Sequence, residues 1–356
     1  MSNIALYRKY RPRSFKDVVG QPQVTRALEG ALKSGSIAHA YLFAGSRGTG
    51  KTSLARIFAR AAGVGDTDLY EIDAASNRGI DDIRALREQV HTLPFGSPYK
   101  CYIIDECHSL TKDAYNALLK TLEEPPSHAL FILATTELEK VPETVVSRCE
   151  LHRFRKPALR ELRALAVSVA VQEGYTLEPE GAELVALIGD GSFRDTLGAL
   201  QKVLGAGGGE AVVDKKTKRR LIPASAAAAI LGAPPATLIR DVVSALAESN
   251  LPAVLALVRE AGGAGGDLKF FAELILRRLR FILLLRYAPE TEEFIRDELS
   301  EEDLATTQEL ARRSGTPINS TLLAALLSAV DAIPRAAIPE LPLELALVKL
   351  LGQDGK

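Results

Sequence analysis

The residues with the clearest chemistry are 45–52, GSRGTGKT, which fit the pattern G-x-x-x-x-G-K-[ST] of a phosphate-binding loop. Lys51 would reach the β and γ phosphates of a nucleotide, and the Thr52 hydroxyl would hold Mg²⁺. Glycines in the loop let backbone N–H groups approach and wrap the phosphates closely. The residues expected to bind ATP here are Gly45, Ser46, Arg47, Gly48, Thr49, Gly50, Lys51, Thr52 and Ser53.

A second chemical signal is the acidic pair Asp105 and Glu106, which follows the apolar run at residues 101–104. Asp105 would orient Mg²⁺ through its water shell, whereas Glu106 would polarise the water that attacks the γ-phosphoryl group. The alternative is an acidic strand end on the surface. The order of loop first and acids second is typical of nucleotide hydrolases and favours the catalytic interpretation.

Thr136 and Arg148 are two further candidates for the same reaction. Residues 129–134 predict a buried strand that delivers Thr135 and Thr136 to its C-terminal end, where parallel sheets bind ligands. Thr136 is therefore expected to sense the γ-phosphate or the attacking water, although threonines often end strands without such a role. Arg148, in the triplet Ser-Arg-Cys at residues 147–149, is on sequence alone equally compatible with a solvated charge.

Two stretches are candidates for contacts other than phosphate chemistry. Val18 and Val19 would lie beside an adenine base, unless the N-terminal segment is only an arm packed on its domain. The turn containing Arg78, Gly79 and Ile80 feeds a helix expected at residues 81–89, whose free N–H groups would take a DNA phosphate. The acidic residues at that helix start suit the helix dipole equally well, so the two interpretations stay open.

These residues must be positioned by strands and helices, and the sequence predicts a strand before the phosphate loop and a helix after it. Residues 41–44 predict a buried strand before the phosphate loop, and the spacing of Leu54, Ile57 and Phe58 predicts a helix after it. A glycine-rich turn without a ligand does not need this strand, loop and helix order. We therefore expect an α/β ATPase domain with a parallel sheet at residues 1–156.

The pattern after residue 157 contains only helices. We predict a helical lid domain at residues 157–208, a basic linker at 209–221 and an all-helical domain at 222–356. The charge run at residues 215–220 is typical of a solvated connector. In the last part apolar residues are abundant and polar catalytic groups absent, which indicates an assembly surface.

Composition sets further bounds on the function. The 356 residues are 47% hydrophobic and carry a net charge of −1, so any contact with DNA must be local. The three cysteines are too few and too badly spaced for a disulfide framework or a four-ligand zinc site. No apolar run approaches the length of a membrane span, and we expect a soluble, cytoplasmic protein.

Several motifs occur together in the clamp-loader branch of the AAA+ ATPases, which this chain resembles over nearly its whole length. The most specific are YRKYRP at residues 7–12, VVGQ at 18–21, EIDAASN at 71–77, NALLKTLEEPP at 116–126 and LPLELALVKL at 341–350. The resemblance implies an ATPase domain, a lid and a collar that joins subunits, including delta and delta prime, into a pentameric ring. Such a ring serves the bacterial replicative polymerase by opening the sliding clamp (beta) and placing it on primed DNA.

The resemblance also assigns two arginines and shows one departure. It implies that Arg148 is an arginine finger reaching a neighbour's ATP in trans and that Arg194 touches the γ-phosphate in cis. Members of the family usually carry a four-cysteine zinc module before the Glu71 strand, whereas residues 62–68 close that gap here, so no structural zinc is expected. The chain also lacks the long extension of the longer family members, and we expect a short product or a truncated one.

Two alternatives compete with a clamp-loader motor. Residues 105–108, Asp-Glu-Cys-His, resemble the DECH box of a nucleic-acid helicase, but such helicases need a second motor domain, and the C-terminal half predicts only helices. The other alternative is a clamp-loader-like scaffold that binds ATP without hydrolysing it. Decay of the phosphate loop or of the acidic pair usually accompanies that role, and both are intact here.

Overall fold

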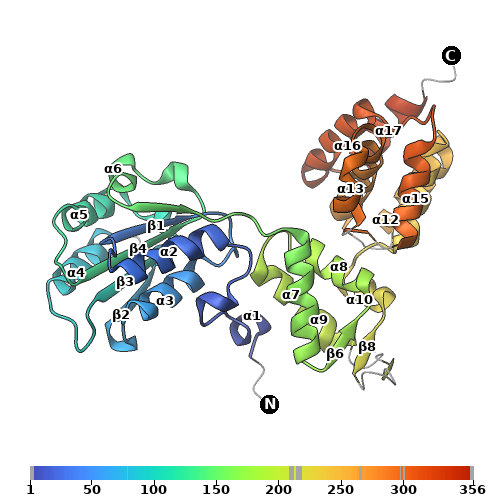
Figure 1. Ribbon diagram of the computed structural model, residues 1–356. Helices are drawn as coiled ribbons and strands as arrows, with labels where there is room; N and C mark the ends of the chain where they lie inside the picture. Colours follow the sequence, from blue (N-terminus) through green and yellow to red (C-terminus); the bar gives the residue numbers. More distant parts are fainter. Residues whose placement is uncertain are drawn as a thin grey trace. The chain divides into compact units, whose positions relative to one another are not determined.

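The computed structural model describes residues 4–77, 79–207, 212–213, 219–263, 267–296, 298–299 and 301–352. The chain forms two compact units (Figure 1): Met1–Leu162 with Gly189–Gly198, and Arg163–Ile188 with Ala199–Lys356. The finer division into a nucleotide-binding domain, lid, linker and collar stays a prediction. None of the helices within the described ranges is long and apolar enough to cross a membrane.

The first unit is built on a five-stranded parallel sheet with the order β2-β3-β4-β1-β5. Ala44 pairs with Thr135, and Asp73 pairs with Asp105, so the C-terminal ends of four strands meet at one edge. The phosphate loop and the acidic pair leave the sheet at this edge, as the sequence predicts. The strands are β1 (Ala40–Ala44), β2 (Leu69–Asp73), β3 (Lys100–Asp105), β4 (Ala129–Thr135) and β5 (Glu150–Arg153).

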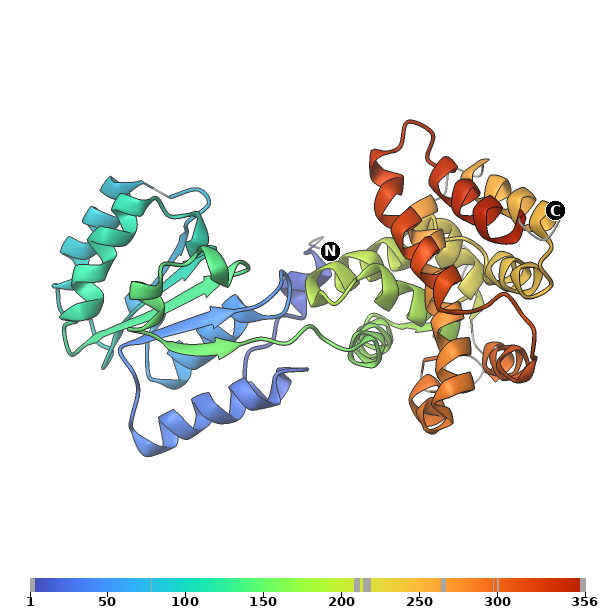
Figure 2. The same cartoon turned by 90° about the horizontal axis from the view of Figure 1, so that it is seen from above.

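Helices cover both faces of this sheet, and the strand residues alternate between them (Figure 2). In β4, Leu130 and Ile132 join the core beneath α2 and α3, whereas Phe131 and Leu133 join the core beneath α4 and α5. This alternation follows from the two-residue period of a strand, and burial on both faces explains why β4 is apolar throughout. The helices are α2 (Pro22–Ser34), α3 (Lys51–Ala61), α4 (Ile80–Val90) and α5 (Lys112–Glu123).

Short elements complete the first unit. The helices are α1 (Leu6–Lys9) and α6 (Glu143–Val146), and the 3-10 helices are η1 (Phe15–Asp17), η2 (Asp66–Asp68), η3 (Cys107–Ser109) and η4 (Leu138–Lys140). The unit also contains the beginnings of α7 (Leu159–Gln172) and α9 (Phe193–Gly207).

The direct connection from α3 to β2 is stabilised by a buried carboxylate. Asp68 is fully buried and accepts hydrogen bonds from the backbone N–H groups of Phe95 at 2.7 Å, Gly96 at 3.3 Å and Ser97 at 3.2 Å. Burial alone would raise the pKa of Asp68, but the hydrogen bonds from residues 95–97 outweigh it and lower this pKa. The short connection before β2 is therefore anchored to residues 95–97 through Asp68.

We expect Asp68→Asn to destabilise the first unit by about 1–3 kcal/mol at neutral pH, because an amide replaces a charged acceptor of buried N–H groups. A carboxyl with a depressed folded-state pKa stabilises above its unfolded value of about 3.9, and that stability is lost as pH falls through the folded value. The difference in unfolding free energy between the two proteins should therefore shrink below about pH 4. Urea unfolding at several pH values measures it, with the exposed Asp66→Asn as control. A pH-independent difference would contradict this role.

The second unit combines helices with a small sheet of order β6-β8-β7. The strands are β6 (Tyr175–Leu177), β7 (Val212–Val213) and β8 (Arg220–Ile222). The sequence pattern predicted only helices after residue 157 and a solvated linker at 209–221, so these strands correct that expectation. Strand β7 lies within the predicted linker, and β8 begins in it and pairs in parallel with β6. Lys215, Lys216 and Lys218 lie outside the described residues.

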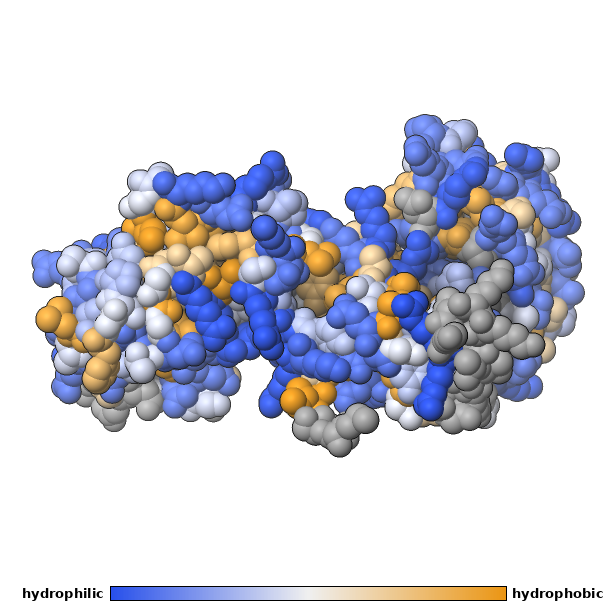
Figure 3. All heavy atoms as spheres, turned by 60° about the horizontal axis from the view of Figure 1, so that its bottom comes forward, coloured by the Kyte–Doolittle hydropathy of each residue, from blue (hydrophilic) through white to orange (hydrophobic). Residues whose placement is uncertain are grey.

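Helices of the C-terminal part form a large hydrophobic core in this unit. Its buried residues include Val243, Phe271, Leu279, Leu326 and Leu347. On the face of the protein shown in Figure 3, most surface residues are hydrophilic, and hydrophobic residues form smaller patches among them. The helices are α8 (Pro179–Ile188), α10 (Ala224–Leu231), α11 (Ala236–Ala247), α12 (Leu251–Gly263), α13 (Leu268–Tyr287), α14 (Glu292–Arg296), α15 (Glu301–Arg312), α16 (Ser320–Ala332) and α17 (Leu341–Leu351), with 3-10 helices η5 (Pro289–Thr291) and η6 (Ile333–Arg335).

Candidate nucleotide site

The phosphate loop joins β1 to α3 and has the backbone shape that its glycines allow. Gly48 and Gly50 adopt left-handed angles, with φ of 75° and 100°. A Cβ on Gly48 would lie 1.9 Å from Ser192 Oγ, and the Gly48 carbonyl accepts a hydrogen bond of 3.0 Å from the backbone N–H of Phe193. The start of α9 therefore packs on the loop. The family resemblance pointed to Arg194, in this helix, but the sequence gave no sign of the Ser192 contact.

Lys51 lies at the start of α3 and is only 6% exposed. Its Nζ donates to the carbonyl oxygens of Gly45 at 2.7 Å and Ser46 at 3.0 Å. Burial lowers the pKa of Lys51, against the opposing charges of Glu106 and Asp105. No carboxylate of the described chain forms an ion pair with it. A buried ammonium whose hydrogen-bond partners are carbonyls fits the binding of an anion, as the nucleotide prediction requires.

The two predicted Mg²⁺ ligands lie against each other. The Thr52 hydroxyl donates to Asp105 Oδ2 at 2.7 Å, and Asp105 Oδ1 accepts from the backbone N–H of Glu106 at 3.1 Å. Hydroxyl and carboxylate oxygens are the donors that Mg²⁺ prefers, so these residues fit the ion that ATP would bring. In the described ranges no three His, Cys, Asp or Glu side chains gather where they could hold a metal ion, and the absence of structural zinc stays a prediction.

Glu106 and Thr136 also meet at this edge. The Thr136 hydroxyl donates to Glu106 Oε2 at 3.0 Å. Glu106 itself has left-handed backbone angles, with φ 49° and ψ 44°, which are uncommon for a residue with a side chain. The sequence suggested that Thr136 senses the γ-phosphate or the attacking water. The hydrogen bond from Thr136 to Glu106 places this threonine beside the residue predicted to polarise that water.

Two arginines from other parts of the chain lie near the phosphate loop, and one of them, Arg11, was not predicted from the sequence. Arg194, in the first turn of α9, is exposed, lies 6.0 Å over the Tyr7 ring, and lowers the pKa of Lys51 by its charge. Arg11 Nε donates to Ser53 Oγ at 3.0 Å, and the pKa of Arg11 is lowered by burial and by neighbouring arginines. The motif at residues 7–12 was recognised in the sequence, but nothing there linked Arg11 to Ser53.

The other predicted site residues lie elsewhere or outside the described chain. Arg148 donates to Glu123 Oε1 at 2.7 Å and to the Thr144 carbonyl at 2.7 Å, away from the group around Lys51. Val18 is half-buried, and Val19 is 40% exposed.

The three predicted DNA contacts are only partly visible. Arg78 lies outside the described residues, Gly79 precedes α4, and Ile80 is the first residue of α4. Their contact with DNA stays a prediction.

The fold and this arrangement of loop, acidic pair and threonine define an AAA+ P-loop ATPase fold followed by helices. Among solved structures, the RuvB Holliday junction branch migration motor of Thermotoga maritima superposes with a TM-score of 0.52 at 21% identity, covering 73% of this chain and 86% of that one. This likeness concerns the fold. Two family models match: "DNA polymerase III, delta subunit" at residues 65–158 and "DNA polymerase III subunits gamma and tau domain III" at residues 222–354.

The chain is similar in sequence to gamma and tau subunits of DNA polymerase III. It is 38% identical to the gamma/tau subunit of Mycobacterium tuberculosis over 98% of its own length and 62% of that protein. It is 35% identical to the tau subunit of Bacillus subtilis (82% of this chain, 54% of that one) and 33% identical to that of Escherichia coli (81% and 46%). The chain thus spans about half to three fifths of the length of these relatives.

Proposed function

We propose that this chain is the ATP-hydrolysing motor subunit of a bacterial clamp loader, which opens the sliding clamp and places it on primed DNA in the cytoplasm. The observation that carries the proposal is the set of contacts at one sheet edge: Lys51 in the phosphate loop, Thr52 on Asp105, and Thr136 on Glu106. Sequence similarity to gamma and tau subunits of DNA polymerase III supports the clamp-loader setting. The chain's intact acidic pair favours hydrolysis over a scaffold role.

Each residue has a separate task in this proposal. ATP with Mg²⁺ supplies the phosphoryl group and the metal charge when bound. Lys51 neutralises phosphate charge, and Thr52 and Asp105 hold the ion. Glu106 polarises a water, with its carboxylate held by Thr136. Arg194 adds positive charge from α9.

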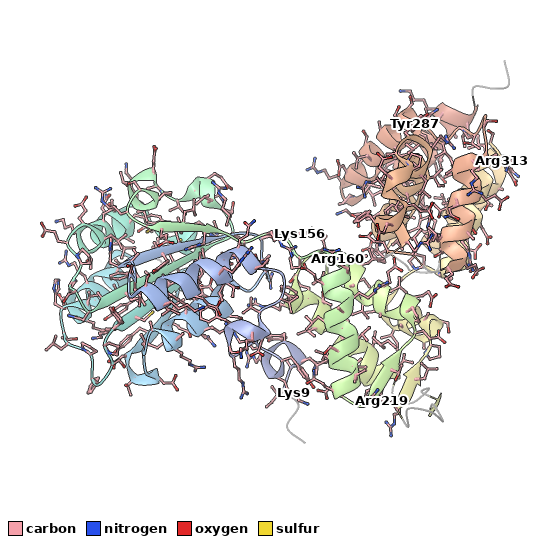
Figure 4. All side chains as sticks on the ribbon, viewed as in Figure 1. Lys9, Lys156, Arg160, Arg219, Tyr287 and Arg313 are labelled. Atoms are coloured by element: carbon pink, nitrogen blue, oxygen red, sulfur yellow. The ribbon has the colours of Figure 1, made fainter. Side chains whose placement is uncertain are left out.

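The helical C-terminal part would join subunits, among them delta and delta prime, into a pentameric ring. Leu341, Leu345 and Val348 follow each other at helical spacing on α17 and are 40%, 60% and 46% exposed. Leu327 of α16 is 57% exposed, and Tyr287 at the end of α13 (Figure 4) is 76% exposed. Large apolar side chains exposed along one helix are typical of a protein interface.

We expect Leu345→Glu to prevent ring assembly while the subunit itself stays folded, because the change puts a charge into the proposed interface. Light scattering after mixing with the partner subunits measures the mass of the complex. Ala305→Glu, which adds the same charge at an exposed position of α15, is the matched control. Complexes of full mass with Leu345→Glu would place the interface elsewhere.

We expect Arg78→Ala to weaken DNA-stimulated hydrolysis and to lower the salt slope of DNA binding by about one, as loss of one phosphate contact requires. Titrations of primed DNA at several salt concentrations give the slope. Lys33→Ala removes an exposed charge at the end of α2 and serves as control. An unchanged slope would return Arg78 to the role of a solvated charge.

The proposal as a whole is tested by single-turnover ATP hydrolysis in the assembled complex, with and without clamp and primed DNA. A clamp-loader motor hydrolyses ATP, and clamp together with primed DNA accelerates it. A scaffold binds ATP without hydrolysis under every condition. A helicase would be stimulated by DNA without the clamp and would unwind a duplex.

A further inference from the structure

A histidine that the proposed mechanism does not use lies beside the catalytic glutamate. His108 belongs to η3, two residues beyond Glu106, and its side chain is 14% exposed. Its Nδ1 lies 3.5 Å from Glu106 Oε2 and 3.1 Å from Thr135 Oγ1. Its Nε2 lies 3.3 Å from Glu137 Oε1.

The partners of His108 are themselves firmly placed. Thr135 is the last residue of β4, is fully buried, and accepts a hydrogen bond of 3.0 Å from the backbone N–H of Glu137. Glu137 also forms an ion pair of 2.6 Å with Lys140. The imidazole is therefore held between the end of β4 and the segment after it. With a hydrogen on Nδ1, this edge of the ring attracts Glu106 Oε2.

Glu106 has an uncommon left-handed backbone conformation, which neighbouring contacts must hold in place. Left-handed angles cost a residue with a side chain roughly 1–2 kcal/mol and persist where the surroundings hold them in place. The contacts from Thr136 and from His108 both fall on Oε2. Within the described ranges no hydrogen bond is made to Oε1, so this oxygen is the one left to polarise a water.

We propose that His108 is a positioning residue for Glu106, which holds Oε2 together with Thr136 and thereby directs Oε1 toward the water. The inference rests on the proposed ATPase function and deepens it. His108 acts through Glu106 and has no contact with the phosphate loop residues in the described structure. Its loss should therefore lower the rate of hydrolysis and leave nucleotide binding intact.

The first test compares His108→Ala with the parent protein in the assembled complex. We expect kcat to fall about tenfold or more, since small displacements of a catalytic group have effects of this size, while the Kd for ATP stays within about twofold. His91→Ala, an exposed histidine in the same unit, is the control. An unchanged kcat in His108→Ala would overturn the inference.

Two conservative variants separate positioning from general packing. The amide of Asn overlays the Nδ1 position, whereas that of Gln reaches the Nε2 position. His108→Asn should keep most of the activity, and His108→Gln should behave like His108→Ala. These variants also keep the test decisive if alanine disturbs folding. Equal losses in Asn and Gln variants would contradict contact through Nδ1.

A double variant shows whether the effect passes through Glu106. In the Glu106→Gln background, His108→Ala should cause no further loss, because the carboxylate that it positions is gone. A loss of the same size in both backgrounds would assign His108 an independent structural role. If the parent protein and His91→Ala hydrolyse no ATP, the proposed function and this inference both fail. If both hydrolyse ATP and His108→Ala does so at the same rate, only this inference fails.

Discussion

Lys51→Ala should abolish tight ATP binding, whereas Glu106→Gln should keep binding and lose turnover. Lys51 is buried at the phosphate loop, with Nζ hydrogen bonded to the Gly45 and Ser46 carbonyls, so alanine leaves phosphate charge without a partner. Each charge-assisted hydrogen bond contributes about 1.5–3 kcal/mol, and we expect the Kd for ATP to rise about 100-fold or more.

Glu106→Gln tests the other half of this division. The amide keeps the size of the side chain and an oxygen for Thr136, but it removes the charge that polarises a water. General base catalysis contributes about 10²–10⁴-fold, so kcat should fall by that factor with the Kd for ATP nearly unchanged. Fluorescent nucleotide titration and single-turnover hydrolysis measure the two quantities, with the exposed Lys112→Ala as control. Equal losses of affinity in both variants would reject these roles.

Arg148→Ala should leave ATP binding by the isolated subunit nearly intact but cripple hydrolysis in the assembled ring. In its own subunit Arg148 contacts Glu123 and the Thr144 carbonyl, and both side chains of the ion pair are partly exposed, 35% and 49%. Such a pair contributes about 0–1 kcal/mol and would release the arginine readily to a neighbour's phosphates. An arginine supplied in trans is worth about 10³–10⁵ in rate.

Mixed rings give the decisive comparison for Arg148. An Arg148→Ala chain keeps an intact nucleotide site, and a Glu106→Gln chain keeps an intact Arg148. The interface that joins this intact site to this intact arginine should hydrolyse ATP. The rate of hydrolysis by mixed rings should therefore exceed that of rings made from either variant alone. If mixtures of confirmed size never recover activity, Arg148 acts in cis or is structural.

Local patterns in the sequence were sufficient for much of this fold. The phosphate loop, the acidic pair and the order of strands and helices around them were predicted because each has its own period or spacing. Helix α4, predicted at residues 81–89, begins and ends within one residue of that range, at Ile80 and Val90. The apolar strands β1, β3 and β4 were recognised by their burial on both faces.

The missed elements lack such local signals. Strand β5, Glu150–Arg153, lies at the sheet edge and buries only His152, so its sequence has no apolar run. Strands β6, β7 and β8 are two or three residues long, too short for a period to show.

The missed site residues depend on contacts across the fold. Ser192 meets Gly48, Arg11 meets Ser53, and His108 meets Thr135 and Glu137, pairs whose spacing in the chain carries no pattern. Only the parallel register of the sheet brings the ends of β3 and β4 together. The signal that could have found His108 is its place directly after the acidic pair, which was considered only as part of a helicase motif.

The central claim is tested most directly by clamp loading itself. The assembled complex, labelled sliding clamp and primed DNA with blocked ends are mixed, ATP is added, and clamp retained on DNA after a challenge with salt is measured. We predict that the clamp is retained on DNA only with hydrolysable ATP and that Lys51→Ala abolishes this retention. With Glu106→Gln, the loader should stay bound to clamp and DNA and fail to release them. Retention that is equal without ATP, or equal in the parent and Lys51→Ala proteins, would contradict the account.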